Sequence, residues 1–230
     1  MIKENLLVLD IDDTLTSSQQ KHTDSLLFAM NQMGIDGVDT DWRNYKNATD
    51  SYILKSNYER KFQKHFNLKL ISSFEKVMTE HFLTYKNSLE IKGAKQMVDF
   101  FINETNYAVC FATGSLLKPA LLKMHQSGIG FAPDVLEASN ILFTREEIVS
   151  SAIDKAKKYY GINEIKNIIS FGDGLWDVFT ARNLKLNFVG VNTKNTKDFI
   201  KQKVEYHIND WLDFDLNKME KIFKIEINER

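Results

Sequence analysis

The segment Leu6-Leu7-Val8-Leu9 places four large apolar residues in a row and leads directly into Asp10, Asp12 and Asp13. Such a run is typical of a strand that is buried on both faces, as in a parallel sheet. In open α/β sheets, ligands bind outside the carboxyl ends of the strands. Two carboxylates as close as Asp10 and Asp12 repel each other, so either a cation lies between them or one of them holds a proton. Taken alone, the segment is either a functional site that uses these carboxylates or only an acidic turn after a strand. The remaining sequence is needed to distinguish the two.

The composition describes a globular chain of 230 residues, which is enough for one large domain or for a core domain with a smaller insert. Lys and Arg number 30 and Asp and Glu 31, so the net charge of −1 gives no bulk electrostatic reason to expect nucleic acid or an acidic membrane as a partner. Cys110 is the only cysteine and lies in an apolar run, which excludes an intrachain disulfide and favours a packed core thiol. No secretory signal pattern or membrane-length apolar run is present, so we expect a cytoplasmic protein, monomeric or homodimeric.

The hydrophobic pattern changes after Thr16. Between residues 17 and 89 the apolar residues recur at helical spacing, and none of the segments reads as a buried strand. Strand and helix patterns then alternate from Gly93 onward, with buried strands expected at 107–112, 167–171 and 187–191. This alternation predicts an α/β fold with a doubly wound parallel sheet. The predicted division is a core domain formed by residues 1–16 and 90–230, with an inserted α-helical domain formed by residues 17–89.

Polar residues follow three of the predicted strands. Asp10 and Asp12 follow the first strand, Thr113 and Gly114 the second, and Asp173 and Asp177 the third. The carboxyl ends of parallel strands lie at one edge of a sheet, so these groups are expected to converge. Their carboxylates form the hard oxygen ligand set that Mg²⁺ prefers, and no cluster of His or Cys competes for a softer metal.

The segment Asp10-Ile-Asp12-Asp-Thr14 resembles the DxDxT signature of the haloacid dehalogenase-like (HAD) hydrolase superfamily. A strand ending at Thr113, a basic residue downstream of it and a GDxxxD element at residues 172–177 follow in that family's order. The similarity spans nearly the whole chain and is greatest to the phosphoglycolate-phosphatase-like branch. It implies a Rossmann-like core, and it implies that the helical insert is similar to the C1 cap of the family.

The resemblance also implies roles for the reacting residues. Asp10 would be the nucleophile that forms an aspartyl-phosphate. Asp12 would protonate the leaving alcohol and later deprotonate water, which requires a pKa nearer neutrality than that of a free Asp. Thr113 would offer a hydroxyl to the phosphate, and Gly114 would let a backbone N–H approach it.

For the metal, the resemblance implies that Mg²⁺ lies between Asp10, the backbone carbonyl of Asp12, and Asp173. Asp177 would be a further ligand or would orient the metal-bound waters. The family usually places a lysine near the start of the helix before the GDxxxD strand, to stabilise the phosphoryl charge. This chain has Arg145 at that helix start and Lys155 farther along; we prefer Arg145 by position, and both remain candidates.

Several polar residues of the chain allow two interpretations. The pair Thr49-Asp50 is either a helix cap, with one of the two as the capping residue, or a substrate contact, and the helix cap is preferred. Trp42 and Arg43 are left unassigned. The histidines are scattered, and each is interpreted as a surface or satisfied residue without a site role: His22, His65, His81, His125 and His207.

Asp12 bears on the reaction class. Halide expulsion needs no proton, whereas phosphoryl transfer from an alcohol does, so a carboxyl group at this position favours phosphoryl transfer. The main hypothesis is a Mg²⁺-dependent phosphatase that acts on a small phosphorylated metabolite. The alternatives are a phosphomutase similar to β-phosphoglucomutase and a catalytically idle protein that binds a phosphate ligand or has a regulatory role.

Overall fold

The computed structural model describes residues 2–191, 194 and 196–225 of the chain. Its centre is a parallel six-stranded sheet with the strand order β5-β4-β1-β6-β7-β8. In that order the strands are β5 (Leu136–Glu137), β4 (Tyr107–Ala112), β1 (Asn5–Leu9), β6 (Asn167–Gly172), β7 (Asn187–Val191) and β8 (Tyr206–Ile208). The predicted α/β class and parallel sheet are confirmed.

Strand β1 lies in the middle of the sheet, which explains its continuous apolar sequence. All of its residues are buried, and Leu9 pairs with Phe111 of β4 on one side and with Phe171 of β6 on the other. The chain moves outward from β1 in one direction through β4 and β5 and in the other through β6, β7 and β8. The strand order therefore reverses at β1, and such a switch point is where α/β sheets form their binding crevices.

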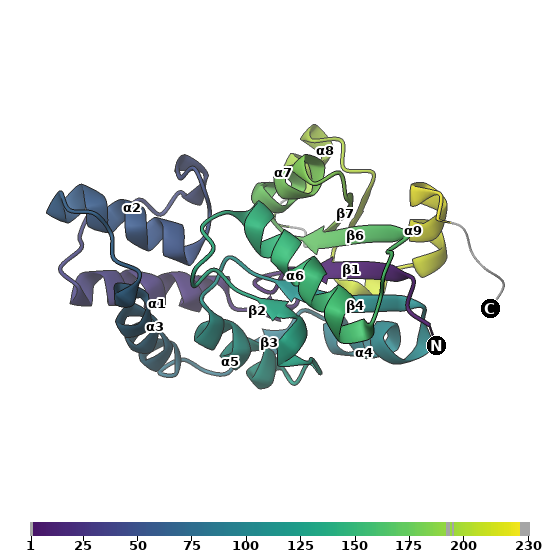
Figure 1. The fold of residues 1–230 in the computed structure, drawn as a ribbon, viewed down its shortest axis with the longest axis horizontal. Helices are drawn as coiled ribbons and strands as arrows, with labels where there is room; N and C mark the ends of the chain where they lie inside the picture. Colours follow the sequence, from purple (N-terminus) through teal and green to yellow (C-terminus); the bar gives the residue numbers. More distant parts are fainter. Residues whose placement is uncertain (1, 192–193, 195, 226–230) are drawn as a thin grey trace.

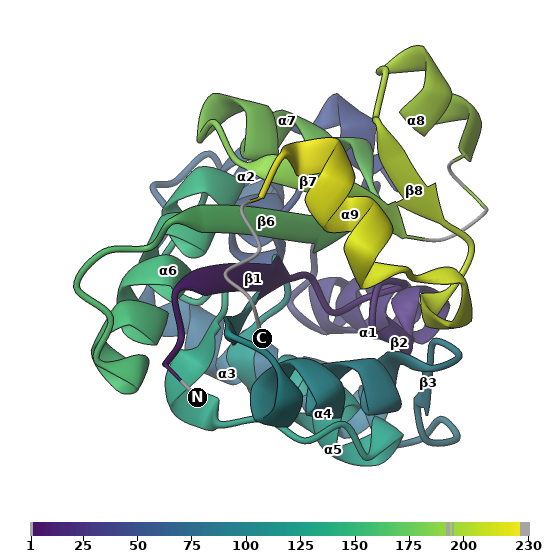
Figure 2. The same cartoon turned by 90° about the vertical axis from the view of Figure 1, so that its right-hand side faces the viewer.

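Helices cover both faces of the sheet (Figures 1 and 2). They are α4 (Ala94–Glu104), α5 (Leu117–Ser127), α6 (Arg145–Tyr160), α7 (Leu175–Asn183), α8 (Thr196–Lys201) and α9 (Leu216–Phe223). The crossover from β1 to β4 through α4 and the crossover from β5 to β6 through α6 run in opposite directions across the sheet, so right-handed connections put α4 and α6 on opposite faces. Helix α9 packs on the α4 face, where the Tyr107 hydroxyl donates to Glu220 at 3.1 Å.

The segment between β1 and α4 forms a separate group of helices, α1 (Gln19–Gln32), α2 (Asp50–Phe62) and α3 (Lys69–Phe82). They pack around a second cluster of buried apolar residues that includes Met30, Leu54 and Phe74. Figure 1 shows this group beyond the carboxyl ends of the sheet strands. A short antiparallel ribbon, β2 (Thr16–Ser17) with β3 (Leu89–Glu90), lies where the chain enters and leaves the helical group.

None of the helices within the described residues is both long and apolar enough to span a bilayer.

Candidate active site

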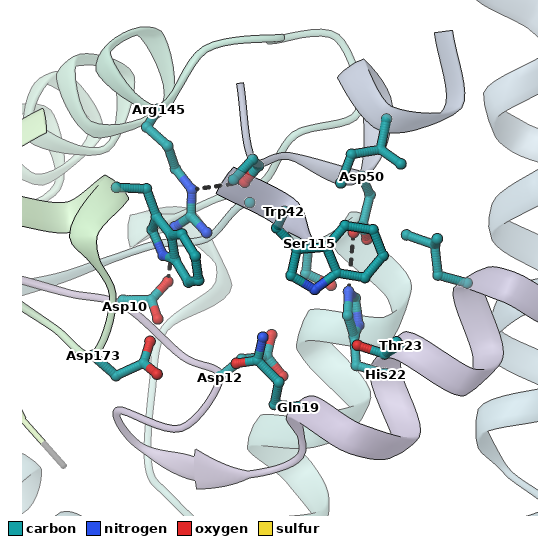
Figure 3. Close-up of a pocket in the computed structure, with 15 residues that line it drawn as sticks. Asp10, Asp12, Gln19, His22, Thr23, Trp42, Asp50, Ser115, Arg145 and Asp173 are labelled. Atoms are coloured by element: carbon teal, nitrogen blue, oxygen red, sulfur yellow. Dashed lines mark hydrogen bonds and ion pairs between the residues drawn. The ribbon is translucent and has the colours of Figure 1, made fainter. Parts of the chain in front are cut away.

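The three polar strand ends meet at the switch point, beneath the helical group. Asp10 follows β1, Gly114 follows β4 and Asp173 follows β6, and all three line one cavity of about 50 Å³ (Figure 3). The Asp10 amide donates to the carbonyl of Phe171 at 3.0 Å, which continues the β1–β6 ladder up to the site. The sheet therefore fixes the backbone from which Asp10 projects, and α1 and α2 close the cavity from the opposite side through Gln19, His22, Thr23, Leu26, Asp50 and Ile53.

Asp10, Asp173 and Asp177 form a buried carboxylate cluster, and each offers an oxygen within 4.8 Å of the others. Burial, followed by the charges of Asp177 and Asp12 and opposed by Arg145, raises the pKa of Asp10 to about 8. Burial and the charges of Asp177 and Asp10 also hold the pKa of Asp173 well above its ordinary value. Buried carboxylates that repel one another in this way favour a bound cation, and three carboxylate oxygens are a donor set that fits Mg²⁺.

Asp177 is held in this cluster by the start of α7. Its Oδ2 accepts from the Gly174 amide at 3.0 Å, an N-terminal capping contact of the helix. A Cβ on Gly172 would overlap the Asp177 carboxylate, so the glycine makes room for that side chain.

Arg145 reaches the cluster from the first residue of α6. Its Nη1 lies 3.1 Å from Asp10 Oδ1 and 3.4 Å from Asp177 Oδ1, and its Nε donates to the Ala48 carbonyl at 3.1 Å. Burial lowers the pKa of Arg145, but Asp177 and Asp10 outweigh it and raise the pKa above its usual value. A capping box of Thr144 with Glu147 fixes the helix start from which Arg145 extends.

Lys155 is not brought to this cluster. Its Nζ donates to the Leu136 carbonyl at 2.8 Å and lies 3.1 Å from Glu137 Oε2, so it binds the edge strand β5. Ten residues separate Arg145 from Lys155, and in this helix that distance carries Lys155 along α6 toward the sheet edge. Of the two basic residues named from the sequence, only Arg145 contacts Asp10 in the described part of the chain.

Gly114 allows the guanidinium of Arg145 to pass close to the β4 loop. A Cβ at this position would lie 2.7 Å from Arg145 Nη2 and 2.8 Å from the Ala48 carbonyl oxygen. The Thr113 hydroxyl is 1 % exposed and accepts from the Ser115 amide at 3.1 Å. Gly114 and Ser115 line the cavity, whereas Thr113 lies behind them and braces the loop.

Asp12 differs from the expectation that its pKa lies nearer neutrality. Burial raises its pKa, but the ammonium of Lys123, with a smaller effect from the hydrogen bond of Ser18, lowers it to about 2. Lys123 Nζ lies 2.6 Å from Asp12 Oδ2, and Ser18 Oγ donates to Asp12 Oδ1 at 2.5 Å. The expectation was wrong for this conformation because the contact of Asp12 with the buried Lys123 ammonium arises from tertiary packing between distant parts of the chain.

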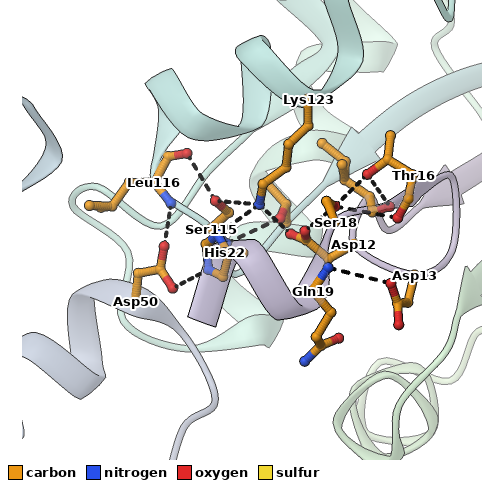
Figure 4. A network of polar contacts seen from close by, with 12 residues as sticks. Asp12, Asp13, Thr16, Ser18, Gln19, His22, Asp50, Ser115, Leu116 and Lys123 are labelled. Atoms are coloured by element: carbon orange, nitrogen blue, oxygen red, sulfur yellow. Dashed lines mark hydrogen bonds and ion pairs between the residues drawn. The ribbon is translucent and has the colours of Figure 1, made fainter. Parts of the chain in front are cut away.

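The Lys123 side chain is completely buried and connects Asp12 to the helical group (Figure 4). Its Nζ also lies 2.8 Å from His22 Nδ1 and donates to Ser115 Oγ at 3.2 Å. On the other side of the imidazole, His22 Nε2 lies 2.9 Å from Asp50 Oδ1, and Asp50 Oδ2 accepts from the Leu116 amide at 2.9 Å. His22 is therefore satisfied at both ring nitrogens, as one part of its interpretation states, and it also lines the cavity, which that interpretation did not anticipate.

The sequence analysis covered the Thr49-Asp50 pair only in part and did not identify Lys123. Thr49 is the N-cap of α2, which confirms the preferred interpretation, and Asp50 lines the cavity in the same turn, so a substrate contact by Asp50 stays a prediction. The sequence contains one indication that Lys123 is buried, because it lies on the same face of α5 as Pro119, Ala120 and Met124, which are also buried. A charged residue on an apolar helix face indicates a buried partner.

Two tryptophans form the wall of the cavity next to Arg145. Trp176 lies under the guanidinium, with Arg145 Cζ 5.9 Å from the ring centroid. Trp42, from the short 3₁₀ helix Trp42–Asn44, comes from the helical group, and both indoles also border a neighbouring hollow of about 310 Å³. The sequence left Trp42 unassigned and offered no pattern that singled out Trp176.

Comparison with known proteins gives fold similarity without close sequence similarity. No protein-family model matches the chain, and no curated protein sequence matches it. Solved structures match over nearly its whole length. A hydrolase from Pseudomonas syringae is 16% identical, with 95% of this chain and 99% of that chain covered and a TM-score of 0.69.

Two further structures agree with this match. A HAD hydrolase of family IA, variant 3, from Entamoeba histolytica is 15% identical, with 96% of this chain and 99% of that chain covered and a TM-score of 0.69. A β-phosphoglucomutase from Clostridium difficile is 15% identical, with 97% and 98% covered and a TM-score of 0.66. The chain therefore has the fold of the haloacid dehalogenase-like hydrolases.

Proposed function

We propose that this protein is a phosphatase that hydrolyses a small phosphorylated metabolite through an aspartyl-phosphate on Asp10. The observation that carries the proposal is the position of the Asp10 carboxylate, which projects into a cavity between the Arg145 guanidinium and the Asp173–Asp177 pair. A nucleophile, a fixed cation and a donor set for a divalent metal are the parts that phosphoryl transfer needs. The solved structures with this fold include hydrolases and a phosphoglucomutase, which supports the same reaction class.

In the first half of the reaction, an Asp10 oxygen attacks phosphorus and the bond from phosphorus to the leaving oxygen breaks. Arg145 opposes the negative charge of both the carboxylate and the phosphoryl oxygens, so the two anions can approach each other. The Gly114 backbone lines the same cavity and has no side chain to block a phosphoryl oxygen. Asp12 gives a proton to the leaving alkoxide.

In the second half, water attacks the phosphorus of the aspartyl-phosphate and Asp12 accepts its proton. Phosphate leaves and the Asp10 carboxylate is restored. The ionised Asp12 beside Lys123 corresponds to the state that accepts this proton, because Lys123 lowers the pKa of Asp12 to about 2. The proton that Asp12 takes from water in the second half is the one that it gives to the leaving alkoxide in the first half of the next turnover.

A Mg²⁺ ion would be held by Asp10 and Asp173, with the Asp12 carbonyl as a further oxygen and Asp177 as ligand or support. When bound, it supplies positive charge that offsets the repulsion between the nucleophile and the phosphate. We assign this ion from the donor set, since the three carboxylates are buried together and share one small space.

We also propose that residues 17–89 form a cap that determines the substrate, with residues 1–16 and 90–230 as the catalytic core. The helical group has its own buried apolar cluster, and its residues Gln19, His22 and Asp50 face the carboxylates across the cavity. Such a lid excludes water from the reacting groups and contributes contacts to the leaving group.

The test is hydrolysis of p-nitrophenyl phosphate with and without Mg²⁺ by the wild type and Asp10→Asn. We expect Mg²⁺-dependent turnover that Asp10→Asn abolishes. The exposed Asp154→Asn on α6 is the matched control and should retain the wild-type rate. An Asp10→Asn protein that keeps the wild-type rate would refute the proposed mechanism.

A further inference from the structure

The cavity has two chemically different halves (Figure 3). Asp10, Asp173 and Arg145 lie on one side, where the phosphoryl group is to react under the proposed function. Gln19, His22, Thr23, Trp42 and Asp50 lie on the other side, and we call these five residues the leaving-group half. The charge and hydrogen-bonding capacity of this half decide what the phosphate can be attached to.

The leaving-group half contains no permanent cation. Arg145 is the only lysine or arginine among the described residues that line the cavity, and its guanidinium faces Asp10 and Asp177. Lys123 is fully buried behind this surface and is engaged by Asp12, His22 and Ser115. Its ammonium offers three protons, so these three contacts leave it none for a substrate.

The hydrogen bonds of His22 define its protonation. An ammonium can only donate, so His22 Nδ1 accepts from Lys123 at 2.8 Å. The opposite nitrogen, Nε2, then carries the proton and donates to Asp50 Oδ1 at 2.9 Å. His22 is neutral in this arrangement, and Asp50 keeps its negative charge because its second contact is the neutral Leu116 amide.

The four residues Asp12, Lys123, His22 and Asp50 therefore carry a net charge of −1 along the leaving-group half. The Asp12 and Lys123 charges cancel, and the Asp50 carboxylate remains without a lysine or arginine within 4.0 Å in the described residues. A second anionic group on the substrate would enter a small, partly desolvated space beside this carboxylate, where repulsion is screened only weakly.

The same half has free capacity for neutral hydrogen bonding. The side-chain amide of Gln19 and the hydroxyl of Thr23 line the cavity, and neither has a hydrogen-bond partner among the described residues. Together they offer donors and acceptors one helical turn apart on α1, a suitable arrangement for alcohol hydroxyls. The volume of about 50 Å³ restricts the leaving group to a few heavy atoms in this conformation.

The adjoining hollow does not supply the missing cation. Arg43 borders that hollow and not the cavity, and Asp41 accepts two hydrogen bonds from its guanidinium, each 2.7 Å long. Lys46 also borders the hollow, beyond the residues that line the cavity.

From this distribution of charge we infer that the enzyme takes phosphomonoesters of small, uncharged, hydroxylated alcohols and discriminates against substrates with a second anionic group. Phosphoglycolate, phosphorylated carboxylic acids and sugar bisphosphates belong to the disfavoured class. The inference rests on the proposed function, and it disfavours a mutase that must hold a bisphosphate. Asp50 is its specificity-determining residue.

The test compares two substrates of nearly the same shape, 2-hydroxyethyl phosphate and 2-phosphoglycolate. The first carries a neutral hydroxymethyl group at the position where the second carries a carboxylate. We expect the wild type to favour the neutral ester by about tenfold or more in kcat/KM, because the carboxylate of 2-phosphoglycolate is repelled by Asp50 in a space of low dielectric. Asp50→Asn should reduce that ratio by about threefold or more, because the repelling charge is removed. Asp154→Asn removes an exposed charge from α6 and should leave the ratio unchanged.

Binding of the same pair to the Asp10→Asn protein, measured by calorimetry, separates this inference from the proposed function. If p-nitrophenyl phosphate is not hydrolysed but the neutral ester still binds more tightly, the proposed function fails and the charge preference stands. If the wild type hydrolyses both esters but prefers 2-phosphoglycolate, the inference is overturned and the phosphatase proposal stands. A ratio that Asp50→Asn leaves unchanged, in a protein that unfolds at the wild-type temperature, also overturns it.

Discussion

Lys123 Nζ lies 2.6 Å from the carboxylate of Asp12, and the lysine side chain is entirely buried. The two residues are 111 positions apart in the chain, and their contact joins the loop after β1 to the middle of α5. In this conformation the pair stabilises the ionised form of Asp12 at the edge of the cavity, the form that accepts a proton from water in the proposed second half of the reaction.

Replacing Lys123 with Met should destabilise the protein by about 3–5 kcal/mol, because a buried carboxylate loses its charged partner. Denaturant unfolding measures this free energy. Lys118→Met is the control on the same helix, since its side chain is 56% exposed and its Nζ is 3.6 Å from Glu75; its loss should cost no more than about 1 kcal/mol. Equal destabilisation by the two substitutions would contradict the assignment of a strong buried pair.

The same pair predicts a dependence of stability on pH. The pKa of Asp12 is lowered from 3.8 to about 2 in the folded protein, so its contribution is fully present above the unfolded pKa and is lost as the pH falls through the folded one. The difference in unfolding free energy between wild type and Asp12→Asn should therefore be constant above about pH 5 and shrink by about 2 kcal/mol toward pH 2. A difference that stays constant down to pH 2 would show that the pKa of Asp12 is not lowered.

Arg145 and Lys155 should differ sharply in their effect on activity. Arg145→Met removes the guanidinium 3.1 Å from Asp10, and we expect kcat/KM for p-nitrophenyl phosphate to fall by about 100-fold or more. Lys155→Met removes a contact with Leu136 and Glu137 at the sheet edge, so the same rate should stay within about threefold of wild type. The opposite order of effects would mean that Lys155 fills the phosphate-stabilising position.

Gly114→Ala should act through Arg145. The added Cβ would lie 2.7 Å from Arg145 Nη2, so the guanidinium must move, and we expect a loss of activity of about tenfold. Steady-state kinetics of a double-mutant cycle test this mechanism: Gly114→Ala should have little further effect in the Arg145→Met background. Fully additive losses would indicate that the alanine damages the loop by another route.

Removal of a metal ligand gives an independent readout. Mg²⁺ should raise the unfolding temperature of the wild type, because an ion that binds only the folded state stabilises it, and Asp173→Asn should remove most of that increase. Asp134→Asn, which changes a carboxylate on the short 3₁₀ helix Pro133–Val135 outside this cluster, should keep it. If Asp173→Asn responds to Mg²⁺ as the wild type does, the ion binds elsewhere.

Much of the fold and half of the candidate site can be predicted from the sequence, because a buried parallel strand has a distinctive run of apolar residues. The continuous apolar run before Asp10 predicts a central strand, and the parallel arrangement alone brings Asp10, Gly114 and Asp173 together. Arg145 follows from the helix start that its capping box defines. These predictions depend on local periodicity and on a regular sheet.

The leaving-group half of the cavity could not be predicted in the same way. The contacts of Lys123 with Asp12 and His22 span 111 and 101 residues, and they depend on how α1 and α2 pack over the sheet. The spacing of apolar residues predicts which face of α1 is buried, but it does not predict that His22 contacts a buried lysine. The lowered pKa of Asp12 was missed for the same reason, because it is a property of tertiary packing.

In the proposed mechanism Asp10 becomes phosphorylated, and mass spectrometry of the acid-quenched Asp12→Asn protein after reaction with p-nitrophenyl phosphate and Mg²⁺ would detect this adduct. This substrate has a good leaving group that needs little protonation, while hydrolysis of the intermediate lacks its base, so the phosphoryl-enzyme should accumulate. We expect one phosphoryl group on the peptide that contains Asp10, and none in the Asp10→Asn, Asp12→Asn double variant. Turnover without any such adduct, or an adduct that persists when Asp10 is replaced, would contradict the proposed mechanism.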